Sequence, residues 1–328
     1  MRAFIITIFI LAGTSACAQP TFFGDEPLAH TYSIVALDPV TGDLGVAVQS
    51  HWFSVGTVVA WGEAGVGVVA TQSLANVSFG PRGLALLKAG LSPQQVLDTL
   101  LATDEGREYR QLSVLDKNGN VATHTGRNCI QPAGHLKGQG FSVQANLMSN
   151  DRIWGAMGKA FEDSKGPLAE RMLAALLAAE AEGGDIRGKQ SAALYVFRAK
   201  STGNLWEEKL VDLRIDDHDE PLKELSRLLK VHRAYEHMNA GDLAMEKNDM
   251  TRAMEEYHAA QQLFPDNEEM QFWTAVTLLN NGDTEEAFPI FSRIFRKNEN
   301  WRRLIPNLVK AGLITVSSDV VEKVNKLK

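Results

Sequence analysis

The sequence has very few cysteines and no excess of basic residues. Among its 328 residues only Cys17 and Cys129 carry a thiol, which is too few for a disulfide framework. The net charge of −7 argues against nonspecific nucleic-acid binding, so we expect no nucleic-acid partner. No expected strand is followed by a G-x-G-x-x-G or Walker sequence, so the sequence offers none of the usual phosphate-binding loops. What remains is the composition of a globular protein long enough for two domains.

Long apolar runs are also scarce, and the run at the N-terminus is too short to span a bilayer as a helix. It covers residues 3–12, follows a basic residue and is followed by small residues. This order is typical of a secretory signal peptide over residues 1–18, with 19–30 as an N-terminal extension. We therefore expect an exported protein, periplasmic or extracellular, with no transmembrane helix in the mature chain. An alternative is a loose lipobox at 14–17, with a lipid anchor on Cys17.

Runs of strands alternate with pairs of helices over residues 31–220, which form the first expected domain. This order favours an α+β fold in which helices are layered on sheets, not a doubly wound parallel sheet. The hairpin around Asn118-Gly119 carries the strongest turn signal. The expected strands are 31–38, 44–50, 57–61, 65–71, 110–115, 121–125, 141–147, 191–198 and 205–215, and the expected helices are 84–89, 96–102, 151–161 and 167–182.

Residues 221–328 form a second expected domain, which is helical, charged and poor in glycine. An internal repeat with a period of 34 pairs Ala253 with Ala287 and Tyr257 with Phe291. Small and aromatic residues at this period resemble the tetratricopeptide repeat. Stacked repeats of this kind bind proteins, so we expect a protein partner for this domain.

The candidate catalytic residues lie where strands begin or end. Thr31 opens the first strand, and a threonine at a free N-terminus can act as a nucleophile with its own α-amine as base. That amine would titrate at about 7.7–8.0, near the working pH. Ser50 and His51 end the second strand and could reach a pocket there. Adjacent strand residues point to opposite faces, so they do not by themselves form a nucleophile–base pair.

Candidate substrate-binding residues follow the buried strand that turns polar after residue 70, and occupy a glycine-rich turn near residue 185. Gln72 and Asn76 could donate to an oxyanion. Arg187 could bind a carboxylate or form an ion pair that clamps the turn. The full set is Thr71, Gln72, Ser73, Asn76, Asp185 and Arg187.

Two clusters with the composition of metal sites lack the spacing of one. His124, Cys129 and His135 match no standard zinc motif. The acidic residues at 216–220 lack the glycine and spacing of an EF-hand, and are better interpreted as a solvated linker. We expect no metal and no cofactor.

Several of these segments together resemble the family called domain of unknown function 1028. The resemblance covers about residues 31–230 and rests most on the long motif at 184–193. The other segments are 31–36, 45–50, 70–73, 80–83, 124–126 and 211–218.

The resemblance implies an N-terminal-nucleophile (Ntn) hydrolase fold, in which two sheets lie between helix layers, and an enzyme that acts on amide bonds. It implies no particular substrate. Members of the family that begin Met-Thr or Met-Ser would expose the nucleophile by losing methionine, and Thr31 matches that position. Here His30 precedes it, so a second cleavage between His30 and Thr31 is needed to free the amine.

Three hypotheses follow. The first is an exported Ntn-type amidohydrolase, with Thr31 as nucleophile and a small-molecule or peptide amide as substrate. The second is a catalytically silent Ntn-like scaffold whose helical repeats bind a protein. The third is a hydrolase with Ser50 as nucleophile, assisted by His51 or His124.

Overall fold

The structure is a computed structural model and describes residues 28–328. The expected signal peptide and Cys17 lie outside the described residues. Contacts divide the chain into two compact units, Met1–Asp212 and Leu213–Lys328. The boundary expected at residue 220 lies next to the first residue of α5, Pro221, and stays a prediction.

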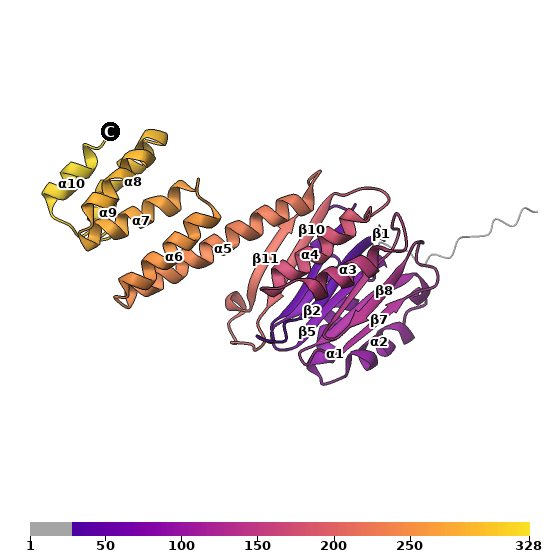
Figure 1. Cartoon of the computed structure of the whole chain (residues 1–328). Helices are drawn as coiled ribbons and strands as arrows, with labels where there is room; N and C mark the ends of the chain where they lie inside the picture. The colour runs from indigo at the N-terminus through magenta and orange to yellow at the C-terminus, as the bar shows by residue number, and fades with distance from the viewer. Residues whose placement is uncertain (1–27) are drawn as a thin grey trace, which may run out of the picture. The chain divides into compact units, whose positions relative to one another are not determined.

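The first unit is built on two antiparallel sheets (Figure 1). The edge strand β11 of the second sheet contains the unit boundary, after Asp212. One sheet has the order β1-β5-β6-β7, with β4 also paired to β5. The other has the order β11-β10-β3-β2-β9-β8. The strands of the first sheet are β1 (Leu28–Ala29), β4 (Ala60–Glu63), β5 (Gly67–Leu74), β6 (Arg110–Asp116) and β7 (Val121–Thr125). Those of the second are β2 (Thr31–Leu37), β3 (Leu44–Ser50), β8 (Gly134–Gly138), β9 (Phe141–Ala145), β10 (Ser191–Phe197) and β11 (Lys209–Ile215).

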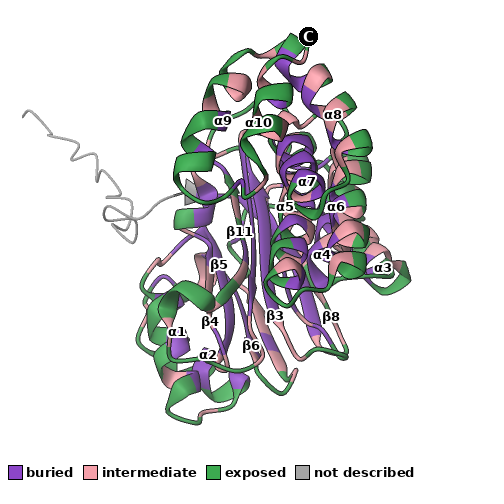
Figure 2. Cartoon of the chain, turned by 90° about the vertical axis from the view of Figure 1, so that its left-hand side faces the viewer, coloured by how far each residue is buried: buried purple, intermediate pink, exposed green. Residues whose placement is uncertain are grey.

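Helices cover the outer face of each sheet, which gives four layers. The helices α1 (Phe79–Lys88) and α2 (Pro93–Ala102) pack on β5, β6 and β7. The helices α3 (Ile153–Asp163) and α4 (Leu168–Ala181) pack on the second sheet. Figure 2 shows buried strands between helices whose outward sides are exposed.

The two sheets share an apolar core that follows the alternation of side chains along each strand. Val35 and Val46 are directly opposed in the β2–β3 pair, and both belong to the core between the sheets. The next residue along, Gly45, faces α4, where a Cβ would lie 2.4 Å from the Met172 methyl group. Because both faces of β2 and β3 are buried, these strands read as continuous buried runs instead of polar–apolar alternation.

The second unit consists of helices joined by short turns. They are α5 (Pro221–Glu246), α6 (Met250–Leu263), α7 (Glu268–Asn281), α8 (Thr284–Lys297), α9 (Asn300–Lys310) and α10 (Ser318–Asn325). The helix α8 begins 34 residues after α6. The repeated pairs Ala253 and Ala287, and Tyr257 and Phe291, are all buried between helices.

The expectation of a mixed fold, with helices layered on sheets and a C-terminal helical region, is confirmed, and the strand pairs within both sheets are antiparallel. The segment 57–61 is not one strand, because a 3₁₀ turn at Val55–Thr57 precedes β4. The strand expected from residue 205 begins at Lys209, after a 3₁₀ turn at Leu205–Glu207. None of the helices between residues 28 and 328 has the length and apolar content needed to cross a membrane.

Candidate active site at the start of β2

Thr31 is fully buried at the point where the chain passes from one sheet to the other. Leu28 and Ala29 belong to the β5 sheet, whereas Thr31 is the first residue of β2 in the second sheet. The Thr31 hydroxyl donates to the carbonyl of Ala29, at 2.8 Å. The residues before Thr31 therefore occupy the space next to its hydroxyl.

The carbonyl of His30, in the peptide bond that precedes Thr31, accepts two hydrogen bonds. Ser50 Oγ donates to it at 2.6 Å, and Arg187 Nη2 donates at 2.8 Å. One donor is neutral and the other is cationic. Two such donors on one carbonyl oxygen polarise the C=O bond and stabilise negative charge that develops on the oxygen.

Asp185 fixes the position of the Arg187 guanidinium. Its carboxylate accepts from Arg187 Nη2 at 2.7 Å and from Nε at 3.1 Å. The same carboxylate accepts from the backbone N–H of Arg187 at 2.9 Å and of His51 at 3.2 Å. The Asp185 side chain is fully buried, while that of Arg187 is 28% exposed. The bidentate pair holds the planar guanidinium in one orientation, aimed at the His30 carbonyl.

A buried network of amide side chains holds Thr31 from the inner side. Gln72 Nε2 donates to the Thr31 carbonyl at 3.0 Å and to Gln111 Oε1 at 2.7 Å. Gln72 Oε1 accepts from Ser33 at 2.6 Å. Asn146 Nδ2 donates to Gln111 Oε1 at 3.0 Å, so residues from β2, β5 and β6 are joined to the segment after β9.

His30 is part of the same network. Because Asn146 Nδ2 donates to Gln111, Asn146 Oδ1 faces His30 Nδ1, 2.9 Å away, and accepts from it. Burial lowers the pKa of the His30 imidazole, the Asn146 hydrogen bond opposes this, and the charge of Arg187 adds to the lowering. The pKa of His30 therefore lies below its ordinary value, which favours the neutral imidazole.

Thr31, around which these residues are arranged, is also the first residue of a family match. The model of DUF1028, described as a family of unknown function, matches residues 31–225. The chain belongs to the DUF1028 family.

Two solved structures are similar to parts of the DUF1028 chain. A DUF1028 protein from Silicibacter pomeroyi is 33% identical, with a TM-score of 0.56, over 62% of this chain and 88% of that chain. Anbu (ancestral beta-subunit) from Yersinia bercovieri is 10% identical over 60% of this chain and 91% of that chain. Its TM-score of 0.32 is too low to establish a shared fold. None of the curated proteins compared with the chain matches it.

The structure of this DUF1028 chain brings together some of the predicted site residues. Ser50, Asp185 and Arg187 surround the His30 carbonyl, and Gln72 holds the carbonyl of Thr31. His51 contributes its backbone N–H to Asp185, whereas the residue itself is exposed. The Ser50 hydroxyl donates a hydrogen bond to the His30 carbonyl, and His124 Nε2 lies 2.9 Å from the Arg107 carbonyl, so these two side chains have different partners.

Two other predicted residues have local partners, and a third, Ser73, pairs through its backbone with β1. Thr71 Oγ1 donates to the Asn76 carbonyl at 3.2 Å. Asn76 Oδ1 accepts from the N–H and the hydroxyl of Ser78, in the turn before α1. Ser73 pairs with Ala29 and has a φ of 74°. A role for these residues in binding substrate stays a prediction.

The sequence patterns do not single out His30, Ser33, Gln111, Gln144 and Asn146. Gln144 belongs to the network because its Nε2 donates to Ser33 Oγ at 3.1 Å. A signal existed for the amides: Gln111 precedes Leu112, Gln144 follows Val143, and both glutamines are fully buried. A buried amide needs partners, which predicts a polar network between the sheets. His30 carried no such signal, because its partner Asn146 is distant in sequence.

The residues considered for zinc do not form a cluster. His135 Nδ1 lies 2.8 Å from Thr125 Oγ1. The Cys129 thiol donates to the Arg110 carbonyl at 3.3 Å, and burial raises the pKa of this thiol, with the Ser73 hydroxyl opposing. Within residues 28–328, no group of three or more His, Cys, Asp or Glu side chains is placed to hold a metal ion.

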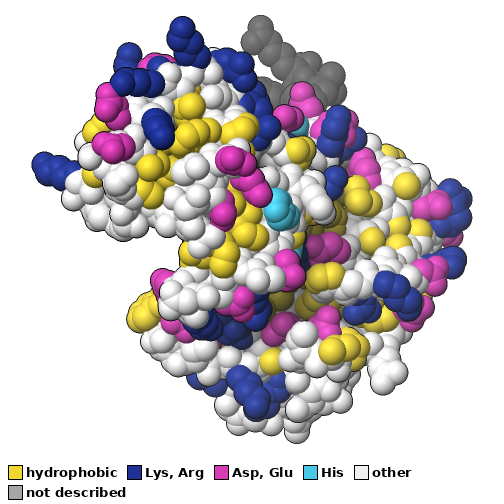
Figure 3. All heavy atoms as spheres, turned by 60° about the vertical axis from the view of Figure 1, so that its left-hand side comes forward, with side chains coloured by type: hydrophobic (Ala, Val, Ile, Leu, Met, Phe, Trp, Pro, Cys, Tyr) yellow, Lys and Arg dark blue, Asp and Glu magenta, His cyan; other side chains and the backbone are white. Residues whose placement is uncertain are grey.

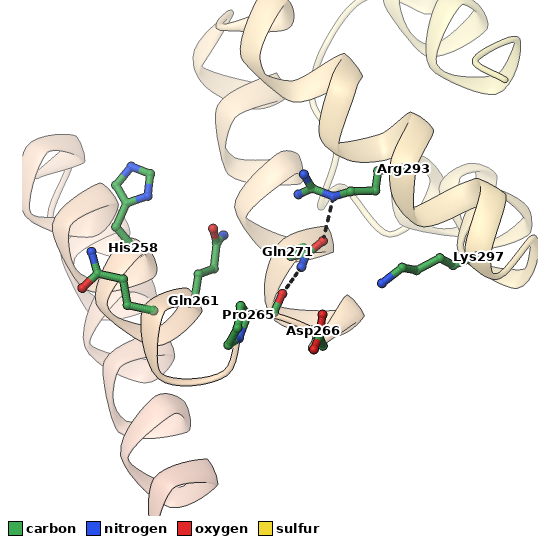
Figure 4. Close-up of a pocket in the computed structure, with 8 residues that line it drawn as sticks. His258, Gln261, Pro265, Asp266, Gln271, Arg293 and Lys297 are labelled. Atoms are coloured by element: carbon green, nitrogen blue, oxygen red, sulfur yellow. Dashed lines mark hydrogen bonds between the residues drawn. The ribbon is translucent and has the colours of Figure 1, made fainter.

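The helical unit has a groove of about 730 Å³ between α6, α7 and α8 (Figure 4). Gln271 donates to the Pro265 carbonyl and accepts from Arg293 Nε at 3.3 Å. The groove is lined by His258, Gln261, Gln262, Pro265, Asp266, Gln271, Arg293 and Lys297. Basic and acidic side chains are interspersed on the face shown in Figure 3.

Proposed function

We propose that this DUF1028 chain is an exported amidohydrolase of the Ntn type, with Thr31 as nucleophile and the α-amine of Thr31 as base. The observation that supports it is the pair of donors, Ser50 and Arg187, on the carbonyl next to Thr31. The proposal requires cleavage of the His30–Thr31 bond, and the same donors favour attack on that carbonyl. The four-layer arrangement of the first unit agrees with the Ntn fold that the family resemblance implies.

The proposed reaction uses the groups around Thr31 in sequence. The free amine takes the proton of Thr31 Oγ1, which attacks the carbonyl carbon of the substrate amide. The oxygen of that carbonyl takes the place of the His30 oxygen, so Ser50 and Arg187 stabilise its negative charge. The protonated amine then gives its proton to the leaving nitrogen as the C–N bond breaks. Water hydrolyses the resulting ester and restores the Thr31 hydroxyl.

The surrounding residues take positioning and binding roles in this proposal. Gln72 fixes Thr31 through its carbonyl, and Asp185 orients Arg187. His51 and Ser73 lie at the edges of the cleft that opens when residues 28–30 leave, with Thr71 and Asn76 beyond Ser73. We propose that the helical unit is a tetratricopeptide-type stack, supported by the interval of 34 residues between α6 and α8.

The test begins with the mature N-terminus. Intact mass and N-terminal sequencing of the exported protein should give a chain that starts at Thr31. A form that starts at Thr31, released from a fusion, should become acylated on that residue by a small β-lactone. Thr31→Ser should retain labelling, and Thr31→Ala should lose it. A mature start at Gln19, together with amide hydrolysis that survives Thr31→Ala, would overturn the proposal.

A second candidate function is a silent scaffold that binds a protein through its helices. The polar groove between α6 and α8 favours it, because Arg293 and Lys297 offer two cations there. Full-length Thr31→Ala should then restore a deletion strain as well as the natural chain does, and Arg293→Glu should not. The opposite pattern supports catalysis.

A further inference from the structure

The short strand β1 occupies a part of the β5 edge that no other described strand covers. The strand β6 pairs with Gly67–Ser73 along one edge of β5. On the other edge β4 pairs with Gly67–Ala70, and β1 pairs with Ser73 and Leu74. The backbone of residues 28–29 therefore completes a sheet edge directly beside Thr31.

Cleavage before Thr31 would turn residues 28–30 from a covalently linked segment into one that can dissociate. Residues 28–30 would no longer be bonded to Thr31, and their dissociation would expose the backbone groups of Ser73 and Leu74. Ala29 is fully buried and His30 is 4% exposed, so the space they leave is enclosed. An exposed sheet edge next to an enclosed space accepts an extended chain as an added strand.

We infer that the substrate is an extended peptide that occupies the place of residues 28–30 and pairs with β5. This inference rests on the proposed function and names its substrate class. The acyl residue of the scissile bond takes the place of His30, with its carbonyl between Ser50 and Arg187. The preceding two residues take the places of Ala29 and Leu28 and pair with Ser73 and Leu74.

The contacts of His30 and Ala29 also define the side chains that fit. Asn146 Oδ1 accepts from the His30 ring, so the acyl position favours a side chain with a neutral N–H donor. The guanidinium of Arg187 binds the same residue's carbonyl, which disfavours a cationic side chain there. The next position is filled by the methyl group of Ala29 with no exposure to solvent, so it favours a small residue. The preferred sequence is a small residue followed by histidine, asparagine or glutamine.

The experiment uses the full chain beginning at Thr31 and the anilide of acetyl-Leu-Ala-His. Two analogues carry an N-methyl group, one on the leucine amide and one on the alanine amide. Consecutive residues of an antiparallel strand turn their N–H groups to opposite sides. Only one of the two N–H groups therefore points to β5, and the other analogue is the matched control.

We expect one analogue to lose about tenfold or more in kcat/KM, as expected for loss of one backbone hydrogen bond at a buried site, while the other keeps most of its rate. Acetyl-His anilide, which lacks the pairing residues, should be poorer than the tripeptide. Asn146→Leu should reduce the preference for histidine over leucine at the acyl position.

The failures of the two proposals can be told apart by the β-lactone probe, which needs no backbone pairing. Labelling of Thr31, with equal turnover of the two analogues, the parent peptide and acetyl-His anilide, overturns the peptide inference alone. Absence of both labelling and turnover overturns the proposed function and this inference with it.

Discussion

Removing the charge of Asp185 should destabilise the first unit and leave Arg187 without its orienting partner. The Asp185 carboxylate is fully buried and accepts four hydrogen bonds, two of them from the guanidinium. Breaking a buried ion pair costs about 3–5 kcal/mol. Because Arg187 is 28% exposed, water recovers part of this loss. We expect Asp185→Asn to cost about 2–3 kcal/mol of unfolding free energy, as for hydrogen bonds to a charged group.

A double-mutant cycle measures the pair itself. Arg187→Met should cost about 3 kcal/mol, because it leaves the buried carboxylate with only two backbone donors. The double variant should cost less than the sum of the two single variants by about 2 kcal/mol. A coupling below about 0.5 kcal/mol, the size found for exposed ion pairs, would refute the reasoning.

The assay should report the first unit alone. Cys129 is a free, buried thiol of that unit, so its reaction with a thiol reagent during a brief pulse in urea follows unfolding there. A Cys17→Ser background removes the other thiol of the sequence. The linear dependence of the free energy on urea then gives the stability of each variant.

Two further predictions concern proton binding and helix capping. The folded-state pKa of His30 is lowered, so its neutral form gives stability that is present above the unfolded pKa of about 6.5 and falls as the pH decreases toward the folded pKa. Urea unfolding between pH 7.5 and pH 5 should therefore show a smaller decline for His30→Gln than for the natural chain, and an unchanged decline would contradict the burial argument. Asp249 accepts from the N–H of Arg252 at the start of α6, whereas Asp283, 34 residues later at the start of α8, makes no such cap. Asp249→Ala should destabilise the helical unit by about 1 kcal/mol and Asp283→Ala by less, and circular dichroism melts of the two variants compare them.

Much of the strand pattern was predictable from local signals. The strands β3 and β7 lie where the sequence predicts them, because turn residues bound both of them. The strand β8 was not predictable. Its sequence, Gly134 to Gly138, has glycine at both ends and a lysine inside, and it is extended because it pairs with β9.

The site was predictable where strand ends turn polar and not where partners are distant in sequence. Ser50 and Gln72 met the first condition, and Arg187 was found from its glycine-rich turn. The structure brings all three to the carbonyl groups of His30 and Thr31. The sequence predicts His30 only as the last residue of the N-terminal extension, because nothing near it in sequence shows that Asn146 would bind its ring. The side-chain direction of Thr71 depends on the pairing of β5, which the sequence alone does not specify.

The amide network between the sheets has a consequence for how the two layers are aligned. Apolar side chains tolerate a small slide of one sheet over the other, because dispersion contacts have no direction. Hydrogen bonds do not tolerate such a slide, because the distance between donor and acceptor must stay within a few tenths of an ångström. Gln72, Gln111 and Asn146 therefore lock the sliding of β5 and β6 against β2 at the end that carries Thr31. The hydrogen bonds therefore fix the relative alignment of the two sheets at the end where the proposed nucleophile lies.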